Sequence, residues 1–309
     1  MKAAGGSSLR GRMARYRMHY ALMAGGILYF IIFRYVPMYG ITIAFKNVMP
    51  FDGIWAMVTA PYIGFTHFIN FFRSYYFWNI IGNTLAISGL KLLFGFPAPI
   101  LLALMLNEAW GIRFKKVTQT ISYLPHFISM VVLAGLVSTL LSTSGGVFNE
   151  IIKKFGGETI YFLGEPKYFR TILVVSDVWK NMGWGSIIYL AALSGTNPEL
   201  YEAAIVDGAG RWKQTLYITL PSIAYVIVIM FIFAVGGLLD AGFEQILLLY
   251  SPSVYQVSDI IDTYVYREGL INMKYSFSTA VGLFKSVIAM TLIVGTNALA
   301  RKMGQEGIW

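Results

Sequence analysis

The 309-residue sequence contains no cysteine, which excludes disulfides, thiolate metal ligands and thiol catalysis. Its three histidines, His19, His67 and His126, are far apart and form no helical pair of metal ligands. The nucleotide-binding pattern GxxxxGK[ST], the zinc pattern HExxH and the nucleophile pattern GxSxG are also absent. We therefore expect no catalytic residue, no metal and no bound cofactor in this chain.

Charged residues are scarce as well. They make up 13% of the chain, against 57% hydrophobic residues, and the mean hydropathy is +0.63. Soluble domains carry about 25% charged residues, so this composition indicates an integral membrane protein. We expect one membrane domain over residues 20–300, with cytoplasmic tails at 1–19 and 301–309. The basic amino-terminal segment lacks a small-residue cleavage site, which favours a retained first span over a signal peptide.

Six stretches are long and apolar enough to cross a membrane as helices, which takes about 20 residues each. Pro37 lies just beyond the end of the first stretch. If the proline only kinks the helix, the first span continues past it toward Phe45. Pro97 and Pro99 should bend the second. The six predicted spans are 20–36, 84–106, 120–141, 170–192, 222–241 and 279–300.

Lysine and arginine counts predict the orientation of these spans. With the amino terminus in the cytoplasm, the cytoplasmic pieces contain 12 basic and 5 acidic residues. The outer pieces carry the two signs in more nearly equal number over a much longer stretch. Positive charge concentrates on the cytoplasmic side of membrane proteins, so both termini and residues 193–221 are predicted to be cytoplasmic. The net charge of +9 is thus mainly a topology signal and calls for no nucleic-acid partner.

Three outer segments have local patterns of their own. Residues 65–80 are rich in aromatics at helical spacing, which predicts a helix lying in the headgroup zone. Residues 147–157 separate an apolar from a charged face and predict an amphipathic helix at the outer rim. Residues 243–277 are expected to form an amphipathic or extracellular cap.

The polar stretch 202–221 has a fixed pattern between two apolar spans. Glu202-Ala203-Ala204 is followed after three residues by Gly208, and after nine more by Ile218-x-Leu220-Pro221. One explanation is an ordinary surface helix, with alanines as helix formers and a glycine that ends a turn. Seven specified positions at fixed spacing, in a predicted cytoplasmic loop, favour a more specific explanation.

The pattern resembles the EAA loop of the permease subunits of bacterial ABC importers. The resemblance extends over nearly the whole chain, through FWNIIGNTL (77–85), ALMLNE (103–108), SYLPHFIS (122–129) and WGSIIYLAALSGTNPELYEAAIVDGA (184–209). These segments look like carbohydrate importer permeases, such as those for maltose. YVPMYGITIAFK (35–46) and residues 240–270 are similar to the branch that takes up alginate-type and pectin-type oligosaccharides.

The resemblance implies a type I importer permease with six spans. It implies a second related permease, a dimeric ATPase that binds ATP and magnesium, and an extracytoplasmic binding protein that delivers an oligosaccharide. It also implies that the protein is located in a bacterial cytoplasmic membrane. A short coupling helix would contact the ATPase through Glu202, Ala203, Ala204, Asp207 and Gly208. Glu202 would make a polar contact, the alanines would pack without bulk, and Gly208 would permit a turn.

Charged and polar residues inside predicted spans are candidates for the substrate passage, because charge in hydrocarbon is costly. The candidate passage residues are Lys91, Trp179, Lys180, Asn181 and Lys285. An excess of lysine over Asp177 and the peripheral Asp240 would favour an acidic, uronate-containing oligosaccharide. The alternative is structural: each lysine pairs with an acid or a carbonyl, and Asp177 and Lys180 satisfy each other along one helix.

Two other functions remain open at this point. A secondary carrier for a small polar solute needs no ATPase, but such carriers often show internal repeats, and none is visible here. A membrane-embedded enzyme needs a convergent acid, base or metal cluster, whereas the histidines and carboxylates of this sequence are scattered. Neither alternative explains the pattern at 202–221.

Overall fold

The computed structural model describes residues 16–53, 55–304 and 307–308. Within these residues the regular elements are all helices, and the β pairing is limited to one isolated antiparallel bridge between Lys46 and Tyr62. The prediction of an all-α protein is therefore confirmed. The tails expected at 1–19 and 301–309 lie partly outside the described residues.

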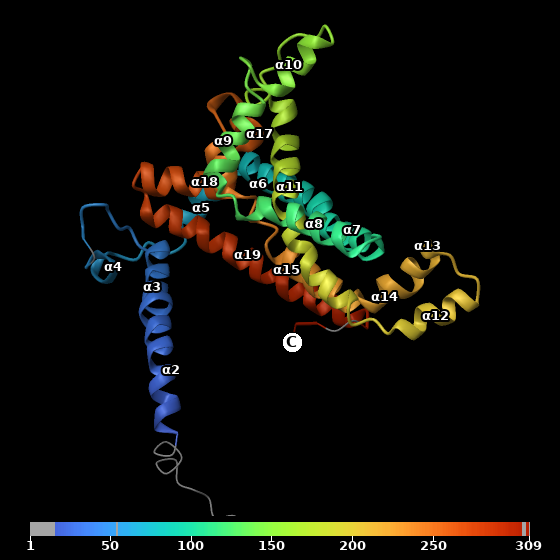
Figure 1. The fold of residues 1–309 in the computed structure, drawn as a ribbon. Coiled ribbons are helices and arrows are strands. Elements are labelled where there is room, and N and C mark those ends of the chain that lie inside the picture. The colour runs from blue at the N-terminus through green and yellow to red at the C-terminus, as the bar shows by residue number, and fades with distance from the viewer. Residues whose placement is uncertain (1–15, 54, 305–306, 309) are drawn as a thin grey trace, which may run out of the picture.

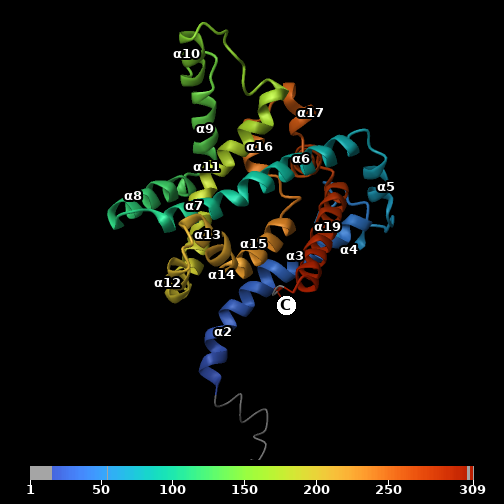
Figure 2. The same ribbon diagram turned by 90° about the vertical axis from the view of Figure 1, so that its right-hand side faces the viewer.

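The first apolar run forms one helical stretch of 29 residues, Arg17–Phe45, longer than the predicted core of 20–36 and including the extension toward Phe45. Figures 1 and 2 both show α2 pointing away from the other helices. None of its most apolar window is buried within the chain. The stretch comprises α2 (Arg17–Phe30), η1 (Ile31–Tyr35), α3 (Val36–Met38) and η2 (Tyr39–Phe45).

Two prolines are accommodated by wider helical turns. The π-helix η1 comes just before Pro37, and a second π-helix, η4 (Thr215–Thr219), comes just before Pro221. Proline has no N–H to donate and its ring crowds the preceding turn, so a local π turn lets the helix continue past it. Pro221 therefore lies inside a helical run, in α14 (Leu220–Ser222), and does not open the next span.

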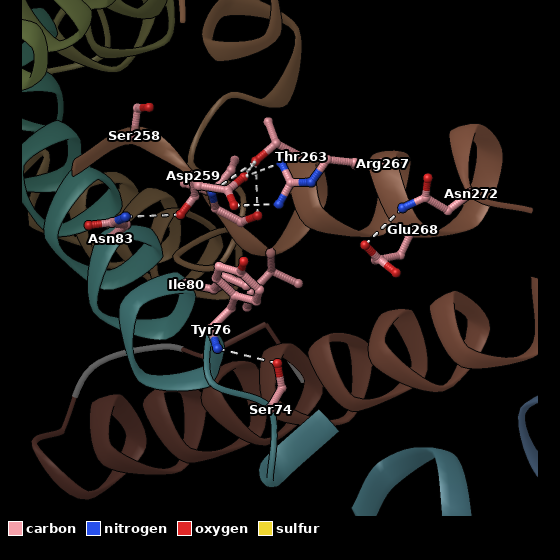
Figure 3. Close-up of polar contacts among 12 residues, drawn as sticks. Ser74, Tyr76, Ile80, Asn83, Ser258, Asp259, Thr263, Arg267, Glu268 and Asn272 are labelled. Carbon is pink, nitrogen blue, oxygen red and sulfur yellow. Dashed lines mark hydrogen bonds and ion pairs between the residues drawn. The ribbon is translucent and has the colours of Figure 1, made fainter. Parts of the chain in front are cut away.

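The second span is longer than predicted and begins earlier. It consists of α6 (Phe77–Gly95) and α7 (Pro97–Glu108), which meet at Phe96. The single interfacial helix expected over 65–80 is accordingly wrong: α5 (Thr66–Phe72) ends at a turn, and the rest of the stretch belongs to α6. In that turn the Ser74 hydroxyl accepts the backbone N–H of Tyr76 at 3.3 Å (Figure 3).

The third apolar run does not form one straight span. Its helices are α8 (Ile112–Tyr123), the short 3-10 helix η3 (Leu124–Phe127) and α9 (Met130–Leu140). The two long parts are bent by 101°. Pro125 removes a backbone donor, Ile128 and Ser129 are extended, and the Ser129 hydroxyl caps α9 by accepting from Val132 N at 3.3 Å. The predicted continuous span 120–141 is thus corrected to a broken one.

The central helix is α11 (Pro166–Leu193), with 28 residues. It lies against α7, α6, α8 and η3, as Figures 1 and 2 show. A Cβ added at Gly183 would collide with the backbone of Ser122 and Tyr123 at the end of α8. The glycine therefore sets how closely the broken third run packs on α11.

A Gly183→Ala substitution should destabilise the protein. Overpacking costs about 1–3 kcal/mol, and the colliding atoms here are backbone, which cannot rotate away. Gly282→Ala on α19 (Tyr275–Lys302) is the matched control, because nothing lies within 4 Å of its added Cβ. Thermal unfolding of the purified variants should show a lower midpoint for Gly183→Ala alone. Equal midpoints would mean that the close packing at Gly183 contributes nothing.

The fifth run begins before its predicted start at 222. Helix α13 (Arg211–Gln214) leads through η4 and α14 to α15 (Ala224–Gly236), with a bend of 64° at Ile223. The sixth run is α19, which contains the predicted 279–300.

By length and composition, three helical stretches are long and apolar enough to cross a membrane, and five if each bent pair counts as one span. The three are Arg17–Phe45, Phe77–Glu108 and Tyr275–Lys302. Helix α11 is long enough but is not among these candidates, since polar residues such as Asp177 and Lys180 lower its hydropathy. These stretches agree with the predicted membrane domain, and the count of six spans stays a prediction.

The segment 243–277, expected to form an amphipathic or extracellular cap, packs into the cores of the fold. It contains α16 (Phe243–Leu249), η5 (Pro252–Val254), α17 (Tyr255–Ser258), α18 (Ile261–Tyr266) and the π-helix η6 (Arg267–Ile271). Its side chains Ile246, Val254, Ile260 and Ile261 are fully buried and pack on the cores formed with α6 and α11. The segment is an integral layer of the fold because its apolar residues are continuous with those of the spans.

The amphipathic helix expected over 147–157 is present as α10 (Val147–Lys154). It lies at the far tip of the molecule (Figure 1). Its buried Asn149 ties the surrounding loop, because the amide donates to the carbonyls of Leu141, Ser142 and Ile160 and accepts from Ile160 N at 2.8 Å.

Candidate functional site

The loop carrying the EAA pattern is a helix–turn–helix at the edge of the molecule (Figure 1). Helix α12 (Pro198–Val206) starts at Asn197, whose side chain accepts from Glu199 N at 3.1 Å. No residue of α12 is buried. Glu202 and Ala203 are exposed and Ala204 is half-buried, so this surface is free to contact another subunit.

A tight turn separates α12 from α13. Gly208 has a φ of +76°, a left-handed conformation that costs side-chain-bearing residues energy. Ala209 N donates to Ala204 O at 2.8 Å, and Gly208 N donates to Ile205 O at 3.0 Å, which closes the end of α12. Asp207, exposed, is the last residue before this turn.

The loop is fastened to the membrane helices at its base. Tyr201 Oη lies 3.0 Å from Thr219 Oγ1, and Gln214 Nε2 donates to Ala209 O at 2.7 Å. Arg211 lies 3.9 Å from the Glu108 carboxylate at the end of α7. These contacts hold the loop against η4 and the end of α7.

Apolar side chains on this loop have no cover within the chain. Ile205 is 63% exposed, Val206 87% and Trp212 75%. A cluster of large exposed apolar residues on a projecting loop marks an interaction surface.

Two cavities lie among the spans and meet at Asp240. The first, here called the Lys91 cavity, has a volume of about 420 Å³ and is lined by Lys91, Asp177, Asn181 and Asp240. The second, the Lys285 cavity, has about 900 Å³ and lies between residues 48–57, α16, α18 and α19. Its charged lining is Asp240, Asp262 and Lys285.

Each lysine in these cavities faces a carboxylate. Lys91 Nζ donates to Gln245 Oε1 at 2.7 Å and lies 3.4 Å from Asp177 Oδ1. Lys285 Nζ lies 2.6 and 2.7 Å from the two oxygens of Asp262. With Asp240 between the pairs, the two linings hold three carboxylates and two ammonium groups. The lysine excess that would favour an acidic substrate is therefore absent from these linings.

Lys180 and Trp179 line neither cavity. Lys180 is 8% exposed, and its ammonium donates to the carbonyls of Pro125, His126 and Ile128 at the break between η3 and α9. This placement matches the structural alternative for Lys180, with carbonyls in the place of Asp177. Trp179 lies beside a separate apolar pocket with Leu90 and Phe94.

A buried polar network that sequence patterns did not reveal links the 259–267 segment to α6, as Figure 3 shows, and α6 to α11. Arg267 donates to both carboxylate oxygens of Asp259, at 3.1 and 2.6 Å, and the Thr263 hydroxyl donates to the same carboxylate at 2.7 Å. These hydrogen bonds raise the pKa of Arg267. Asn83 of α6 donates to Asp259 O at 3.0 Å, and Arg170 of α11 donates to Asn83 Oδ1 at 2.8 Å.

Comparison with known proteins identifies this architecture. The profile of the family described as binding-protein-dependent transport system inner membrane component matches residues 95–305. The chain belongs to this family.

Curated relatives of this inner-membrane component match it over nearly its full length. The polygalacturonan/rhamnogalacturonan transport system permease protein YteP of Bacillus subtilis is 45% identical over 290 residues, which cover 94% of this chain and 89% of YteP. Protein LplB of the same organism is 42% identical over 309 residues, covering all of this chain and 96% of LplB.

A solved structure agrees. A chain of a bacterial ABC transporter involved in the import of the acidic polysaccharide alginate superposes with a TM-score of 0.89 and 45% sequence identity, covering 96% of this chain and 99% of that one. The chain is thus a transport component with the fold of an ABC importer permease.

Proposed function

We propose that this chain is the permease subunit of an ABC importer that carries oligosaccharides from polysaccharide breakdown into the cytoplasm. The substrate class is supported by the relatives, whose names specify alginate, polygalacturonan/rhamnogalacturonan and, at 24% identity, arabinooligosaccharides. The chain itself is a transporter subunit and not an enzyme. ATP and magnesium belong to a partner ATPase.

The observation that carries the proposal is the projecting loop α12–turn–α13. It combines the EAA pattern, a helix without buried residues and a positive-φ glycine at the turn. Val206 and Trp212 are largely exposed within this chain. Exposing large apolar side chains to water costs free energy, so we expect a partner to cover them. We assign the ATPase dimer to this surface, with Glu202, Ala203, Ala204, Asp207 and Gly208 as the coupling residues.

A second, homologous permease completes the assembly. None of the apolar window of helix Arg17–Phe45 is buried within the described part of the chain, and lipid or a partner subunit must cover it. The Lys285 cavity is lined in part by residues 48–50, which come soon after this helix in the sequence. We infer that a partner subunit at this helix completes the wall of the passage. The six apolar runs support six spans, and the lysine and arginine distribution supports cytoplasmic termini in the bacterial cytoplasmic membrane.

The passage in this half of the assembly runs along the two cavities that meet at Asp240. Lys91 and Asn181 serve the first cavity and Lys285 the second, and their donors suit sugar hydroxyls or carboxylates. We assign Lys180 a positioning role at the break before α9, and Trp179 a place at the helix surface. A uronate-containing substrate is supported by the relatives and not by an excess of positive charge in the cavities.

Co-purification tests this assignment. The tagged chain, expressed with its genomic neighbours and extracted in mild detergent, should bring down a nucleotide-binding subunit and a second permease in fixed ratio. A Trp212→Asp variant, which places charge on the exposed loop surface, should retain the second permease and lose the ATPase. Recovery of the chain without any ATPase, in wild type as in the variant, would contradict the proposal.

A further inference from the structure

A third cavity, separate from the proposed passage, lies at the beginning of α19. Its volume is about 490 Å³. Three walls form it: residues 47–50, helix α5, and the turn 268–274 with the first residues of α19. It shares Val48, Met49 and Pro50 with the Lys285 cavity, so the two cavities lie on either side of one strap.

Hydrogen bonds fix all three walls to one another. His67 Nε2 of α5 lies 3.0 Å from Lys46 O, which ties α5 to the strap. Val48 N donates to Ser276 Oγ at 3.1 Å, which ties the strap to α19. Lys274 N donates to Glu268 O at 2.9 Å and closes the turn. The cavity is therefore formed before any ligand arrives.

The polar groups of the turn are paired among themselves. The Glu268 carboxylate accepts from Asn272 Nδ2 at 3.0 Å and from Lys274 Nζ at 2.7 Å. Figure 3 shows Glu268 and Asn272 on the helix that continues from the Asp259–Arg267 pair, which anchors this wall to α6. The turn is thus rigid and electrically balanced, and it holds Met273 at a φ of +56°, unusual for a residue with a side chain.

Two amide side chains in this cavity have no such structural role. Within the described part of the chain, Asn47 and Asn70 both line the cavity as exposed residues, and neither side chain hydrogen-bonds to another protein group. An amide offers two donors and an acceptor, which matches a pair of neighbouring hydroxyls. Tyr264 and Phe277 add ring surfaces to the same lining. Amides beside aromatic rings, with balanced charge, are the chemistry that recognises a sugar ring.

We propose that this Asn47–Asn70 cavity binds one end of the oligosaccharide before it enters the Lys285 cavity. The inference rests on the proposed function and places the site on the outer side, where α19 begins. Because Glu268 is already neutralised by Lys274, the site recognises hydroxyls and accepts neutral and uronate sugars alike. The shared strap 48–50 gives the bound chain a short route to the Lys285 cavity.

The absence of cysteine makes a direct test possible, because a single introduced thiol is the only one in the chain. A Met273→Cys variant, which keeps both amides and places the thiol in the lining of this cavity alone, is exposed to a membrane-impermeant maleimide in the assembled transporter in lipid nanodiscs. Alginate pentasaccharide and a polygalacturonan-derived pentasaccharide are the probes. Asn79→Cys is the matched control, because Asn79 is exposed at the same end of the molecule, on α6, and does not line the cavity.

We expect a saturating pentasaccharide to slow labelling of Met273→Cys roughly tenfold, as for a site about 90% occupied, and to leave Asn79→Cys unchanged. Equal labelling of Met273→Cys with and without both saccharides would overturn the site. So would an unreactive Met273→Cys beside a reactive Asn79→Cys, since a subunit would then cover the cavity. ATP-driven uptake by the wild-type assembly is measured in parallel, and its absence would count against the proposed function and not specifically against this cavity.

Discussion

A Gly208→Val variant is expected to insert into the membrane in normal amount and to lose nearly all ATP-driven uptake. Gly208 has a φ of +76°, and a β-branched residue there is strained by about 1–3 kcal/mol. Relief of the strain would open the turn and reorient α12 relative to α13, so that both helices no longer fit the ATPase together. The measurement is initial uptake rate per membrane-inserted transporter.

Gly210→Ala is the control for this experiment. Gly210 lies two residues away in the same loop, has an ordinary φ of −67°, and has nothing within 4 Å of an added Cβ. Its uptake should stay close to that of wild type.

Glu202→Lys should resemble Gly208→Val in uptake while leaving the loop backbone intact, because Glu202 is exposed. Full transport by Gly208→Val would show that the loop is only a connector.

A Lys180→Met variant is expected to lose most of its folded protein. Its ammonium donates to the carbonyls of Pro125, His126 and Ile128, and methionine offers no donor to replace it. Each buried polar group left unpaired costs roughly 1–3 kcal/mol, so the break before α9 would be left without its main support. The measurement is the fraction of monodisperse protein after detergent extraction, together with its thermal midpoint.

Lys153→Met serves as the matched control, because Lys153 makes only an exposed pair with Glu150 at 3.1 Å. Such pairs contribute about 0–1 kcal/mol, so its yield should match wild type. The positioning role of Lys180 would be refuted by a Lys180→Met variant that folds normally and changes the preference between acidic and neutral oligosaccharides. That result would instead support Lys180 as a residue of the substrate passage.

The helical architecture and the exposed loop between α12 and α13 could be predicted from local sequence patterns, whereas coupling through that loop stays a proposal. Apolar runs of sufficient length, and a polar stretch with fixed spacing at Glu202 and Gly208, depend only on neighbouring residues. The bends were less accessible. Pro125 and Pro221 are visible in the sequence, but one accompanies a break of 101° and the other a π turn followed by a smaller bend of 64°, because the surrounding packing decides how a proline is accommodated.

The partners of the charged residues could not be predicted. Lys285 meets Asp262 from a segment expected to form an amphipathic or extracellular cap, and Lys91 meets Gln245 at a separation of 154 residues. Local periodicity carries no information about contacts at such separations. The buried Asp259–Arg267 pair could not be predicted for the same reason. The burial of α17 and α18 depends on cores shared with α6 and α11, which are far away in the sequence.

The central claim is that this chain forms the membrane passage of an importer driven by ATP on a partner subunit. Its most direct test is uptake of a labelled polygalacturonan-derived oligosaccharide by proteoliposomes that contain the purified assembly. We predict accumulation that requires ATP on the coupling-loop side and the binding protein on the other, and that no ion gradient can replace ATP. Uptake driven by a proton or sodium gradient without ATP would contradict the account and identify a secondary carrier.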